Sequence, residues 1–445
     1  MSNKTSEHLW CCRSELSTDR SRNHGLPTAT SDEQLKVEES IHVDYQYFLN
    51  RKGFDEKELR LEREDHAAYL RNGLKKLSRG FECLDSSRPW LVYWCLHALQ
   101  LLGETQDDDT QLSIINFLAR CQCPDGGFAG GPGQLAHLAP TYAAINALLS
   151  IGTQQAYDVI NRQKLANFLA TMVTSEGSFR MHEGGEVDIR GTYCAVAVAR
   201  LTRIAMHPLF TRTPTWIVQC QTYEGGFSGG PGMEAHGGYT FCGMAALALL
   251  QSQHLADTNR LLRWVSSRQM RYSGGFQGRT NKLVDGCYSF WQGALFPLLH
   301  HIIADDLGAG DSSSVPAQEE DDHCWLFNCE ALQNYLLVCC QSHDGGLVDK
   351  PGKSPDFYHT CYTLSGLSVA QHYCYNNVKK LCVVGDPSNE LELTHPLHNI
   401  VMTAVLAANQ HFSQLPSIQP SVCTFAQDAT PSDTSTTTSD GHSTA

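Results

Sequence analysis

Three residue types that together suit a zinc ion lie at the starts of two apolar segments of the sequence. Asp285 and Cys287 open one of these segments, and His359 opens the next. A carboxylate, a thiolate and an imidazole are all ligands of Zn²⁺, and three protein ligands leave one tetrahedral position open, as in catalytic sites. An Asp-x-Cys pair alone is usually a coincidence, and a lone histidine beside an apolar helix is usually a structural core residue. The shared place of these residues in a repeat favours the metal site.

That repeat occurs six times, and each copy has a tyrosine at the start of an apolar run. The tyrosines are spaced by 49, 51, 46, 49 and 74 residues and are Tyr93, Tyr142, Tyr193, Tyr239, Tyr288 and Tyr362. The residues three positions before them are Trp90, Ala139, Arg190, His236, Asp285 and His359. A period near 50 residues indicates one supersecondary unit copied along the chain. We expect the equivalent positions to surround one mouth.

Each copy pairs an amphipathic segment with a more apolar one. The amphipathic segments are about 65–78, 111–122, 161–173, 214–221, 258–270 and 325–341. The more apolar segments are about 90–102, 140–151, 190–203, 239–252, 287–300 and 360–372. A helix that is apolar all round is buried on every side, whereas an amphipathic helix is half solvated. The alternation predicts an all-α protein, an α/α (α6–α6) barrel of six helix pairs with an inner and an outer ring.

Glycine-rich loops join the two helices of a pair. Four contain Gly-Gly-Phe or Gly-Gly-Leu and begin at Gly126, Gly225, Gly274 and Gly345, and a degenerate fifth begins at Gly177. Glycine permits the positive φ that ends a helix. The apolar residue that follows is expected to fix each loop to the end of the barrel.

The remaining segments bound the domain. We expect residues 1–40 to be a disordered lead, 41–412 to be the barrel domain, and 413–445 to be a disordered tail rich in Ser and Thr. The last tyrosine spacing exceeds the period because of an acidic insertion at about 304–322, which we expect on the surface. The triple aspartate 107–109 is expected to be a charged turn and not a metal site.

Composition narrows the function. The 445 residues carry a formal net charge of -14, which repels nucleic acid. Many of the 18 cysteines lie inside apolar runs, which favours reduced thiols over a secreted disulfide framework. No run approaches the roughly 18 apolar residues that span a membrane. We therefore expect a cytoplasmic protein with no nucleic-acid partner and no transmembrane segment.

A basic cluster adjoins the candidate metal ligands. Arg279 and Lys282 precede Asp285 in one loop, His236 holds the matching position one repeat earlier, and Tyr288 adds a hydroxyl. In an acidic chain this cluster suits a diphosphate, because arginine binds phosphate oxygens in a fork and lysine acts as a point charge. The alternative is that Arg279 and Lys282 are ordinary loop cations.

Aromatic residues gather at the starts of the apolar segments. They are Trp90, Trp94, Tyr142, Tyr193, Tyr239, Trp291, Tyr358 and Tyr362. Aromatics at helical spacing are most often core, but a ring of them at a mouth can line a deep apolar funnel. A metal, an anion cluster and a funnel together suit a lipid diphosphate that meets a metal-bound nucleophile.

These motifs resemble those of the protein prenyltransferase β subunits, over roughly residues 60–410. The residues that carry the resemblance are the Gly-Gly-Phe loops, Asp285-Gly286-Cys287-Tyr288-Ser289-Phe290-Trp291 and Asp356-Phe357-Tyr358-His359-Thr360-Cys361-Tyr362. The resemblance implies one zinc ion held by Asp285, Cys287 and His359. It also implies diphosphate binding by His236, Arg279, Lys282 and Tyr288, and Mg²⁺ binding with the diphosphate by Asp349.

The resemblance further implies a pocket for isoprenoid and peptide. Its residues would be Trp90, Trp94, Arg190, Tyr193, Tyr239, Trp291, Tyr358 and Tyr362. In this family a bulky residue at the position of Trp90 limits the pocket to a fifteen-carbon chain, so farnesyl diphosphate is the implied donor. The implied acceptors are proteins ending in a CaaX sequence, such as small GTPases, and the implied partner is a prenyltransferase α subunit.

Three alternatives remain open from the sequence. The nearest is a geranylgeranyltransferase type I β subunit, which Trp90 and Asp349 disfavour. A non-catalytic α/α-barrel binding module would not require metal ligands and a basic cluster at one mouth. A triterpene cyclase would require an acidic proton-donor motif, which residues 107–109 do not supply.

Overall fold

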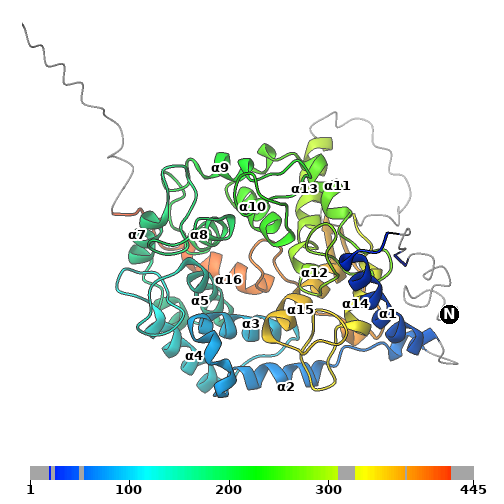
Figure 1. The fold of residues 1–445 in the computed structure, drawn as a ribbon. Coiled ribbons are helices and arrows are strands. Elements are labelled where there is room, and N and C mark those ends of the chain that lie inside the picture. Colours follow the sequence, from blue (N-terminus) through cyan, green and yellow to red (C-terminus); the bar gives the residue numbers. More distant parts are fainter. Residues whose placement is uncertain (1–19, 22–25, 50–54, 309–325, 376–377, 422–445) are drawn as a thin grey trace, which may run out of the picture.

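Two concentric rings of helices form the protein (Figure 1) in a computed structural model that describes residues 20–21, 26–49, 55–308, 326–375 and 378–421. The inner helices are α3 (Arg88–Leu101), α5 (Leu138–Ile151), α8 (Ile189–Leu201), α10 (Gly237–Leu249), α12 (Tyr288–Trp291) and α15 (Phe357–Gln371). The outer helices are α2 (Arg63–Gly73), α4 (Asp108–Cys121), α7 (Arg162–Met172), α9 (Thr213–Gln219), α11 (Thr258–Ser266) and α14 (Cys329–Cys339). Each inner helix packs on the next, and α15 packs on α3, so the inner ring closes. The predicted α/α barrel is confirmed.

The two rings differ in burial as their sequences predict. In α5, every residue from Leu138 to Ser150 except Ala139 is buried. In α11, the buried residues are Leu261, Trp264 and Val265, which recur at helical spacing on one face. Inner helices are therefore enclosed on all sides, whereas outer helices bury one stripe against them.

The glycine loops hold the outer ring close to the barrel end. Gly126 has φ of 106°, and a Cβ there would lie 2.1 Å from the backbone of Lys164 in the next outer helix. The corresponding Cβ at Gly225 would lie 2.3 Å from the carbonyl oxygen of Arg260. Only glycine fits such positions, both for φ and for space. The Phe128 that follows the first loop is fully buried and pins the loop as expected.

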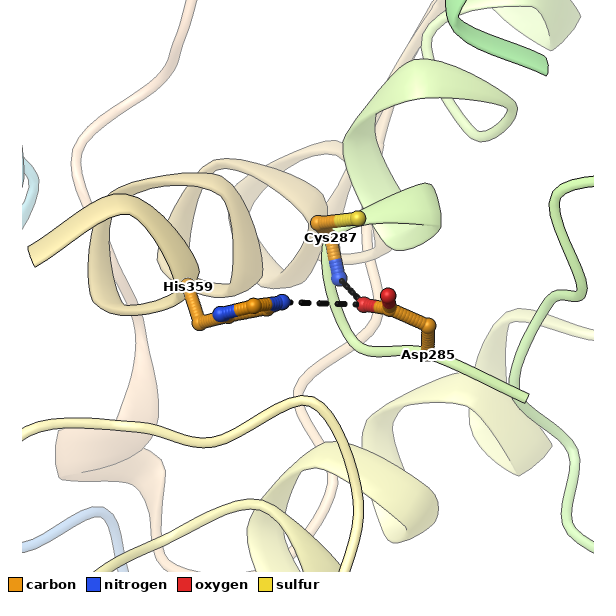
Figure 2. Close-up of side chains that lie close together, drawn as sticks. All are labelled: Asp285, Cys287 and His359. Carbon is orange, nitrogen blue, oxygen red and sulfur yellow. Dashed lines mark hydrogen bonds and ion pairs between the residues drawn. The ribbon is translucent and has the colours of Figure 1, made fainter. Parts of the chain in front are cut away.

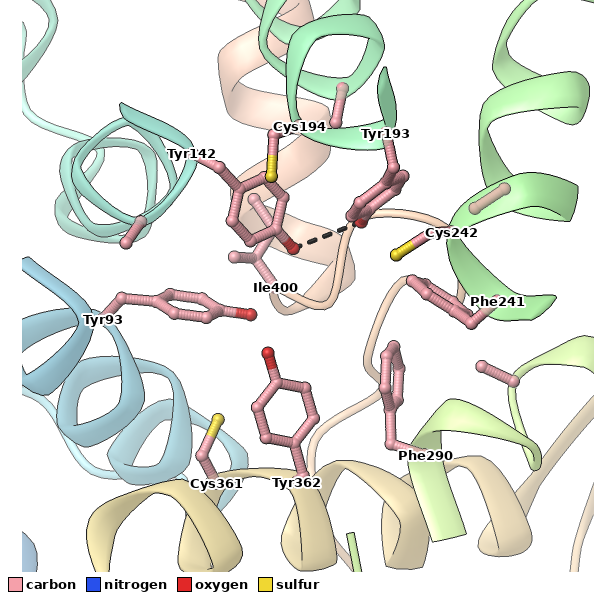
Figure 3. Close-up of a cluster of buried hydrophobic side chains, with 14 of the residues drawn as sticks. Tyr93, Tyr142, Tyr193, Cys194, Phe241, Cys242, Phe290, Cys361, Tyr362 and Ile400 are labelled. Carbon is pink, nitrogen blue, oxygen red and sulfur yellow. Dashed lines mark hydrogen bonds between the residues drawn. The ribbon is translucent and has the colours of Figure 1, made fainter. Parts of the chain in front are cut away.

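One end of the barrel is closed by the segment that precedes α16 (Met402–Ser413). Three inner-ring tyrosines, Tyr93, Tyr142 and Tyr193, point into the ring (Figure 3). Their hydroxyls donate to consecutive carbonyl oxygens of this segment: Tyr93 to Asn399 at 2.6 Å, Tyr142 to His398 at 2.9 Å and Tyr193 to Leu397 at 2.8 Å. The helix α16 then packs on α5 and α8. We call residues 397–400 the floor segment, because they seal the inside of the ring.

The fifth inner helix is broken, which corrects the prediction of one helix over 287–300. The structure has α12, then a turn, then α13 (Leu295–Gly308). Pro297 has no N–H and its ring crowds the carbonyl four residues earlier, at Gly293. That carbonyl instead accepts a bond from Phe296 three residues on, at 3.2 Å. The proline therefore moves the start of the long helix beyond the turn.

A small β-hairpin after α15 was not expected from the sequence. Strands β1 (His372–Tyr375) and β2 (Val378–Leu381) pair antiparallel, with His372 opposite Leu381. The shorter helices are α6 (Gln154–Asp158), η4 (Glu56–Glu58), η5 (Arg79–Ser87), η6 (Gln253–Leu255) and η7 (Pro387–Asn389). The hairpin is a local addition that leaves the two-ring architecture unchanged.

The terminal segments depart in part from the expected boundaries. Residues 29–40, expected within a disordered lead, are the first half of helix α1 (Ala29–Leu49). This helix is ordered by burial of Ile41 and Tyr45 beside α14, and the Tyr45 hydroxyl donates to the Ser273 carbonyl at 2.7 Å. Residues 1–19 and 422–445 lie outside the described residues, as do 309–325 of the acidic insertion. The start of that insertion, up to Gly308, belongs to α13.

No helix among the described residues is long and apolar enough to cross a membrane. The cysteines whose side chains the structure describes are free thiols, and most are buried.

Candidate metal centre and adjoining cavity

Asp285, Cys287 and His359 meet at the junction of two inner-ring segments (Figure 2). Asp285 and Cys287 lie in the loop that leads into α12, and His359 lies in the first turn of α15. Their ligand atoms all lie within 4.8 Å of one another, and His359 Nε2 is 3.4 Å from Asp285 Oδ1. The structure thus brings together the three ligands that the sequence proposed.

The loop of Asp285 is held by hydrogen bonds from two of its backbone N–H groups. Gly286 N–H donates to the Asp349 carbonyl at 2.7 Å, and Cys287 N–H donates to Asp285 Oδ1 at 2.9 Å. A Cβ at Gly286 would lie 2.8 Å from the Thr363 hydroxyl oxygen and 3.0 Å from the Val348 carbonyl oxygen. The glycine lets the loop approach α15 closely enough for the cluster to form.

Asp356 orients the histidine, a role that the sequence analysis missed. Its carboxylate caps α15 by accepting from the His359 N–H at 2.7 Å, and it contacts His359 Nδ1 at 2.6 Å. A carboxylate on one ring nitrogen fixes the tautomer and leaves the other nitrogen for a metal. The signal in the sequence was an aspartate three residues before the histidine, which the structure shows to be the N-cap of α15.

The electrostatics of the cluster favour a bound cation. Burial disfavours the charged imidazole, but the hydrogen bonds and charges of Asp285 and Asp356 outweigh burial and raise the pKa of His359 to about 10. Burial, together with the Asp285 carboxylate, raises the pKa of the Cys287 thiol well above its usual range. The cluster therefore attracts positive charge, and the thiol needs a neighbouring cation before it ionises. The donor set fits Zn²⁺.

An aromatic cavity of about 450 Å³ opens beside the cluster. Every residue predicted for the isoprenoid and peptide pocket lines it: Trp90, Trp94, Arg190, Tyr193, Tyr239, Trp291, Tyr358 and Tyr362. Trp291 stacks on Tyr362 with ring centroids 4.4 Å apart and donates its Nε1–H to the Tyr358 hydroxyl at 3.0 Å. Contacts of this kind make the wall rigid as well as apolar.

The residues at the shared repeat position belong either to the aromatic cavity or to the metal cluster. Trp90, Ala139, Arg190 and His236 line the cavity, whereas Asp285 and His359 belong to the metal cluster. Tyr358, next to His359, is part of the cavity wall. The cluster and the cavity thus adjoin one another at the mouth, as expected from the equivalent positions.

His236 and Tyr288 form a polar pair at the cavity. His236 Nδ1 accepts from the Gly238 N–H at 3.1 Å, so the proton of the neutral ring lies on Nε2. That nitrogen is 3.0 Å from the Tyr288 hydroxyl oxygen. Burial, and then the charge of Arg279, lowers the pKa of His236 and keeps the ring neutral. The imidazole N–H therefore donates to Tyr288, which leaves the Tyr288 O–H free to donate to an anion.

The two predicted loop cations take different directions. Arg279 pairs with Glu234. Lys282 is exposed and lines a separate groove, together with Thr280 and Asn281. The Arg279 loop lies beside the His236–Tyr288 pair, because the Gly278 carbonyl accepts from the Gly237 N–H at 2.7 Å and a Cβ at Gly278 would lie 2.2 Å from the Tyr288 ring. It does not bring Lys282 to the aromatic cavity.

Arg190 and Asp349 are each held by a neighbour. The Arg190 guanidinium donates to both oxygens of Asp188, at 2.6 to 3.2 Å, and lies over the Tyr239 ring at 5.9 Å. The Asp349 carboxylate pairs with Lys350 and accepts the Lys350 N–H at 2.8 Å. A magnesium ion at Asp349 would have to take the place of the Lys350 ammonium, so this donor fits Mg²⁺ less well than the cluster fits Zn²⁺.

Comparisons with known proteins agree with this architecture. The family model "Prenyltransferase alpha-alpha toroid domain" matches residues 61–400. A protein farnesyltransferase subunit beta of Arabidopsis thaliana is 40% identical over 433 residues, covering 86% of this chain and 90% of the relative. A geranylgeranyl transferase type-1 subunit beta of the same organism is 30% identical over 345 residues, covering 70% of this chain and 85% of the relative.

Among solved structures, the Candida albicans protein geranylgeranyltransferase-I complexed with GGPP superposes with a TM-score of 0.62 at 22% identity. The superposition covers 79% of this chain and 99% of the Candida albicans chain. The similarity is one of fold. Fold and family model together define a prenyltransferase α/α toroid. Within that class, the chain belongs to the protein farnesyltransferase β-subunit family. It is therefore an enzyme subunit of the prenyltransferase class.

Proposed function

We propose that this chain is the catalytic β subunit that transfers a farnesyl group from farnesyl diphosphate to the cysteine thiol of proteins ending in CaaX. The observation that carries the proposal is the junction of an Asp-Cys-His cluster with an aromatic cavity. The cluster suits the acceptor substrate, whose cysteine thiol must ionise. The cavity suits the donor substrate, whose isoprenoid chain must be kept from water.

Asp285, Cys287 and His359 would hold one zinc ion, whose positive charge would keep the substrate thiol deprotonated. The three side chains would leave one tetrahedral position open for that thiol, because they are the Asp, Cys and His donors that the described residues bring within 4.8 Å of one another. Asp356 keeps the His359 ring turned with Nε2 toward the other ligands.

The leaving diphosphate would be stabilised by hydrogen bonds and charge at the mouth. Tyr288 offers its O–H, because His236 donates to the Tyr288 oxygen. Arg279 lies close enough to lower the pKa of His236, and it would turn from Glu234 toward the anion. Lys282 would have to turn from the separate groove that it lines in this structure to reach the anion. Donors aimed at developing negative charge lower the barrier of a group transfer.

Trp90 supports farnesyl over a longer donor. Its ring packs on Trp94 and Tyr142, with centroids 5.5 and 5.7 Å away, and occupies space that a longer chain would need. The greater identity to the Arabidopsis farnesyltransferase subunit than to the geranylgeranyl relative points the same way. A geranylgeranyltransferase type I β subunit remains the second candidate of the same class.

The partners follow from the family. We propose that the chain works as a heterodimer with a prenyltransferase α subunit, that its acceptors include small GTPases, and that Mg²⁺ joins the diphosphate near Asp349. The expectation of a cytoplasmic protein stays a prediction.

The test is transfer by the reconstituted heterodimer. The chain would be expressed with a prenyltransferase α subunit and assayed with a CaaX peptide and either farnesyl or geranylgeranyl diphosphate, before and after removal of zinc. We expect farnesyl transfer that disappears with zinc and returns on its addition. Transfer of only the longer chain would overturn the role of Trp90.

A ligand variant separates the metal site from the fold. Cys287→Ala should lose stoichiometric zinc and turnover, whereas Cys121→Ala, in the outer helix α4, should keep both. An intact heterodimer that transfers neither prenyl group would instead support a non-catalytic binding module.

A further inference from the structure

A second basic groove lies outside the aromatic cavity, between the start of α1 and the loop 277–282. Its volume is about 690 Å³. Its lining includes two cations, Arg268 and Lys282, and the hydroxyl residues Thr28, Thr30 and Thr280. No carboxylate is among the lining residues, although the chain as a whole carries a net charge of -14. The nearby acids, Asp32 in the first turn of α1 and Glu224 beside Thr280, are not lining residues. A lining that gathers donors in this way suits an anion.

The first turn of α1 adds a second set of donors to this groove. Thr28 caps the helix, because its side chain accepts from the Ser31 N–H at 3.1 Å and its carbonyl from the Asp32 N–H at 3.0 Å. The amides of Ala29 and Thr30 have no partner within the helix, since they precede the first intrahelical bond. The 21-residue helix also directs its positive dipole end into the groove.

Arg268 is the independent sign of a missing ligand. The residue is 8% exposed, and its Nε–H is buried with no hydrogen-bond partner among the described residues. One terminal nitrogen donates to the Thr280 hydroxyl, and the guanidinium lies 5.3 Å from the Trp264 ring centroid. The nearby acid is Glu224, whose carboxylate is engaged by Thr280 at 3.2 Å. A buried guanidinium with an unused N–H is costly unless an acceptor completes it.

The composition of the groove selects the kind of anion. The aromatic cavity offers a hydrocarbon wall, whereas this groove has only Leu35 and Met270 as large apolar lining residues. An isoprenoid tail would find little to bury here, but a small polyanion would meet helix amides, hydroxyls and two cations. We infer that the groove binds inorganic diphosphate. Its origin as the product leaving the mouth rests on the proposed function, because loop 277–282 borders both places.

The test counts inorganic diphosphate bound by the intact heterodimer in metal-free buffer, by calorimetric titration. Thr30→Glu places a negative charge at the helix start, where it favours the helix but repels the anion. Ser40→Glu adds the same charge about 15 Å further along α1, at about 1.5 Å per residue, and serves as the matched control. His236→Ala removes a group of the aromatic mouth.

We expect two diphosphate ions per unmodified chain. Thr30→Glu and Arg268→Gln should weaken one of them at least about tenfold, as Coulomb energies at contact distance imply. Ser40→Glu should leave both, and His236→Ala should weaken the other ion. Because Thr30 is exposed, a folding defect in Arg268→Gln would not affect the test with Thr30→Glu.

The outcomes separate this inference from the proposed function. If Thr30→Glu binds diphosphate as Ser40→Glu does, the groove site is wrong, whatever the transfer assay shows. If no prenyl transfer is found but one ion still depends on Thr30, the groove stands and the proposed reaction fails.

Discussion

At the scale of single residues, the metal cluster depends on a side chain that does not belong to it. Asp356 both starts α15 and holds His359 Nδ1 at 2.6 Å, so that one carboxylate sets the position of the helix and of the ligand. Because the same aspartate does both, a change there acts on the backbone and on the ring together. A test must therefore distinguish loss of the helix cap from loss of ring orientation.

Asp356→Asn separates these two effects. Asparagine still caps a helix, but it is a weaker acceptor for the imidazole N–H. We expect zinc affinity to fall by roughly 10- to 100-fold, the usual cost of losing such a partner, with little change in thermal unfolding of the metal-free protein. Competition with a chromogenic chelator measures the affinity. Unchanged affinity would mean that the His359 ring is oriented by its packing alone.

The charge of His359 predicts a pH dependence for the metal-free protein. Its pKa is raised to about 10 in the folded chain, against about 6.5 when unfolded. The imidazolium therefore adds stability that is fully present below pH ~6.5 and is lost as the pH rises toward about 10. Thermal unfolding with chelator present, compared with His359→Gln, should show the difference between the two proteins shrinking across that window. A constant difference would contradict the pairing.

Trp90 predicts a change of donor. Trp90→Thr removes the ring that packs on Trp94 and Tyr142 and lengthens the cavity. We expect kcat/KM for geranylgeranyl diphosphate to rise and the preference for farnesyl diphosphate to fall by about tenfold or more, since a removed steric block is worth roughly 1–3 kcal/mol. Trp264→Phe, in the outer ring, should leave the preference unchanged. The ratio of the two kcat/KM values decides.

The sequence predicted the location of single residues where they occupy, or lie next to, the same position in each copy of the repeat. The ligands and the aromatic wall share or adjoin one position in each copy, so the sequence could place them together. Asp356 was missed because its role comes from the N-cap geometry, which a spacing does not show. The direction in which Lys282 points could not be predicted from the sequence either, because it depends on the turn at Asn281, which has φ of 61°.

At the scale of elements, the break between α12 and α13 is the main departure from the predicted pattern. The apolar period continues across 287–300, so periodicity alone predicts one helix. Pro297 overrides it by removing one backbone donor and crowding the carbonyl of Gly293. The Gln292 side chain then reaches the Gln277 carbonyl of the mouth loop at 2.5 Å. The break thus ties the inner ring to the loop that carries Arg279.

Gly293→Ala tests this break. A Cβ there would lie 2.0 Å from the Ser289 carbonyl oxygen, which is backbone and cannot turn aside. We expect a loss of stability of about 1–3 kcal/mol, as for other overpacked sites. Gly80→Ala is the control, because its nearest neighbour would be the Ser78 hydroxyl oxygen at 3.6 Å. Chemical denaturation of both variants provides the measurement, and equal stability would show that the turn can relax.

At the scale of the whole molecule, the barrel is closed twice. The ring closes where α15 packs on α3, and one end closes where three tyrosines hold the floor segment 397–400. The sequence predicted the ring, because the six copies are visible in it. It did not predict the floor, because the carbonyls that the tyrosines bind belong to backbone with no repeat and no side-chain signature.

The floor predicts a shared contribution to stability. Changing Tyr93, Tyr142 and Tyr193 together to Phe removes three hydroxyl donors. The Leu397 and Asn399 carbonyls lose these partners, whereas the His398 carbonyl keeps the Asn146 amide at 3.2 Å. We expect the free energy of unfolding to fall by about 2–4 kcal/mol, at roughly 1 kcal/mol for each bond. Hydrogen exchange at residues 397–401 should rise as well. Protection that stays at the level of the unmodified protein would mean that α16, and not the tyrosines, holds the segment.

The floor also sets an order on biosynthesis. A nascent chain emerges from its N-terminal end, so the tyrosines of α3, α5 and α8 are made long before the carbonyls that they bind. Until residues 397–400 have been synthesised, the three hydroxyls lack these carbonyl partners. Contacts between such distant parts of a chain form slowly. The end of the barrel that the floor segment covers is therefore completed only after all six helix pairs have been made.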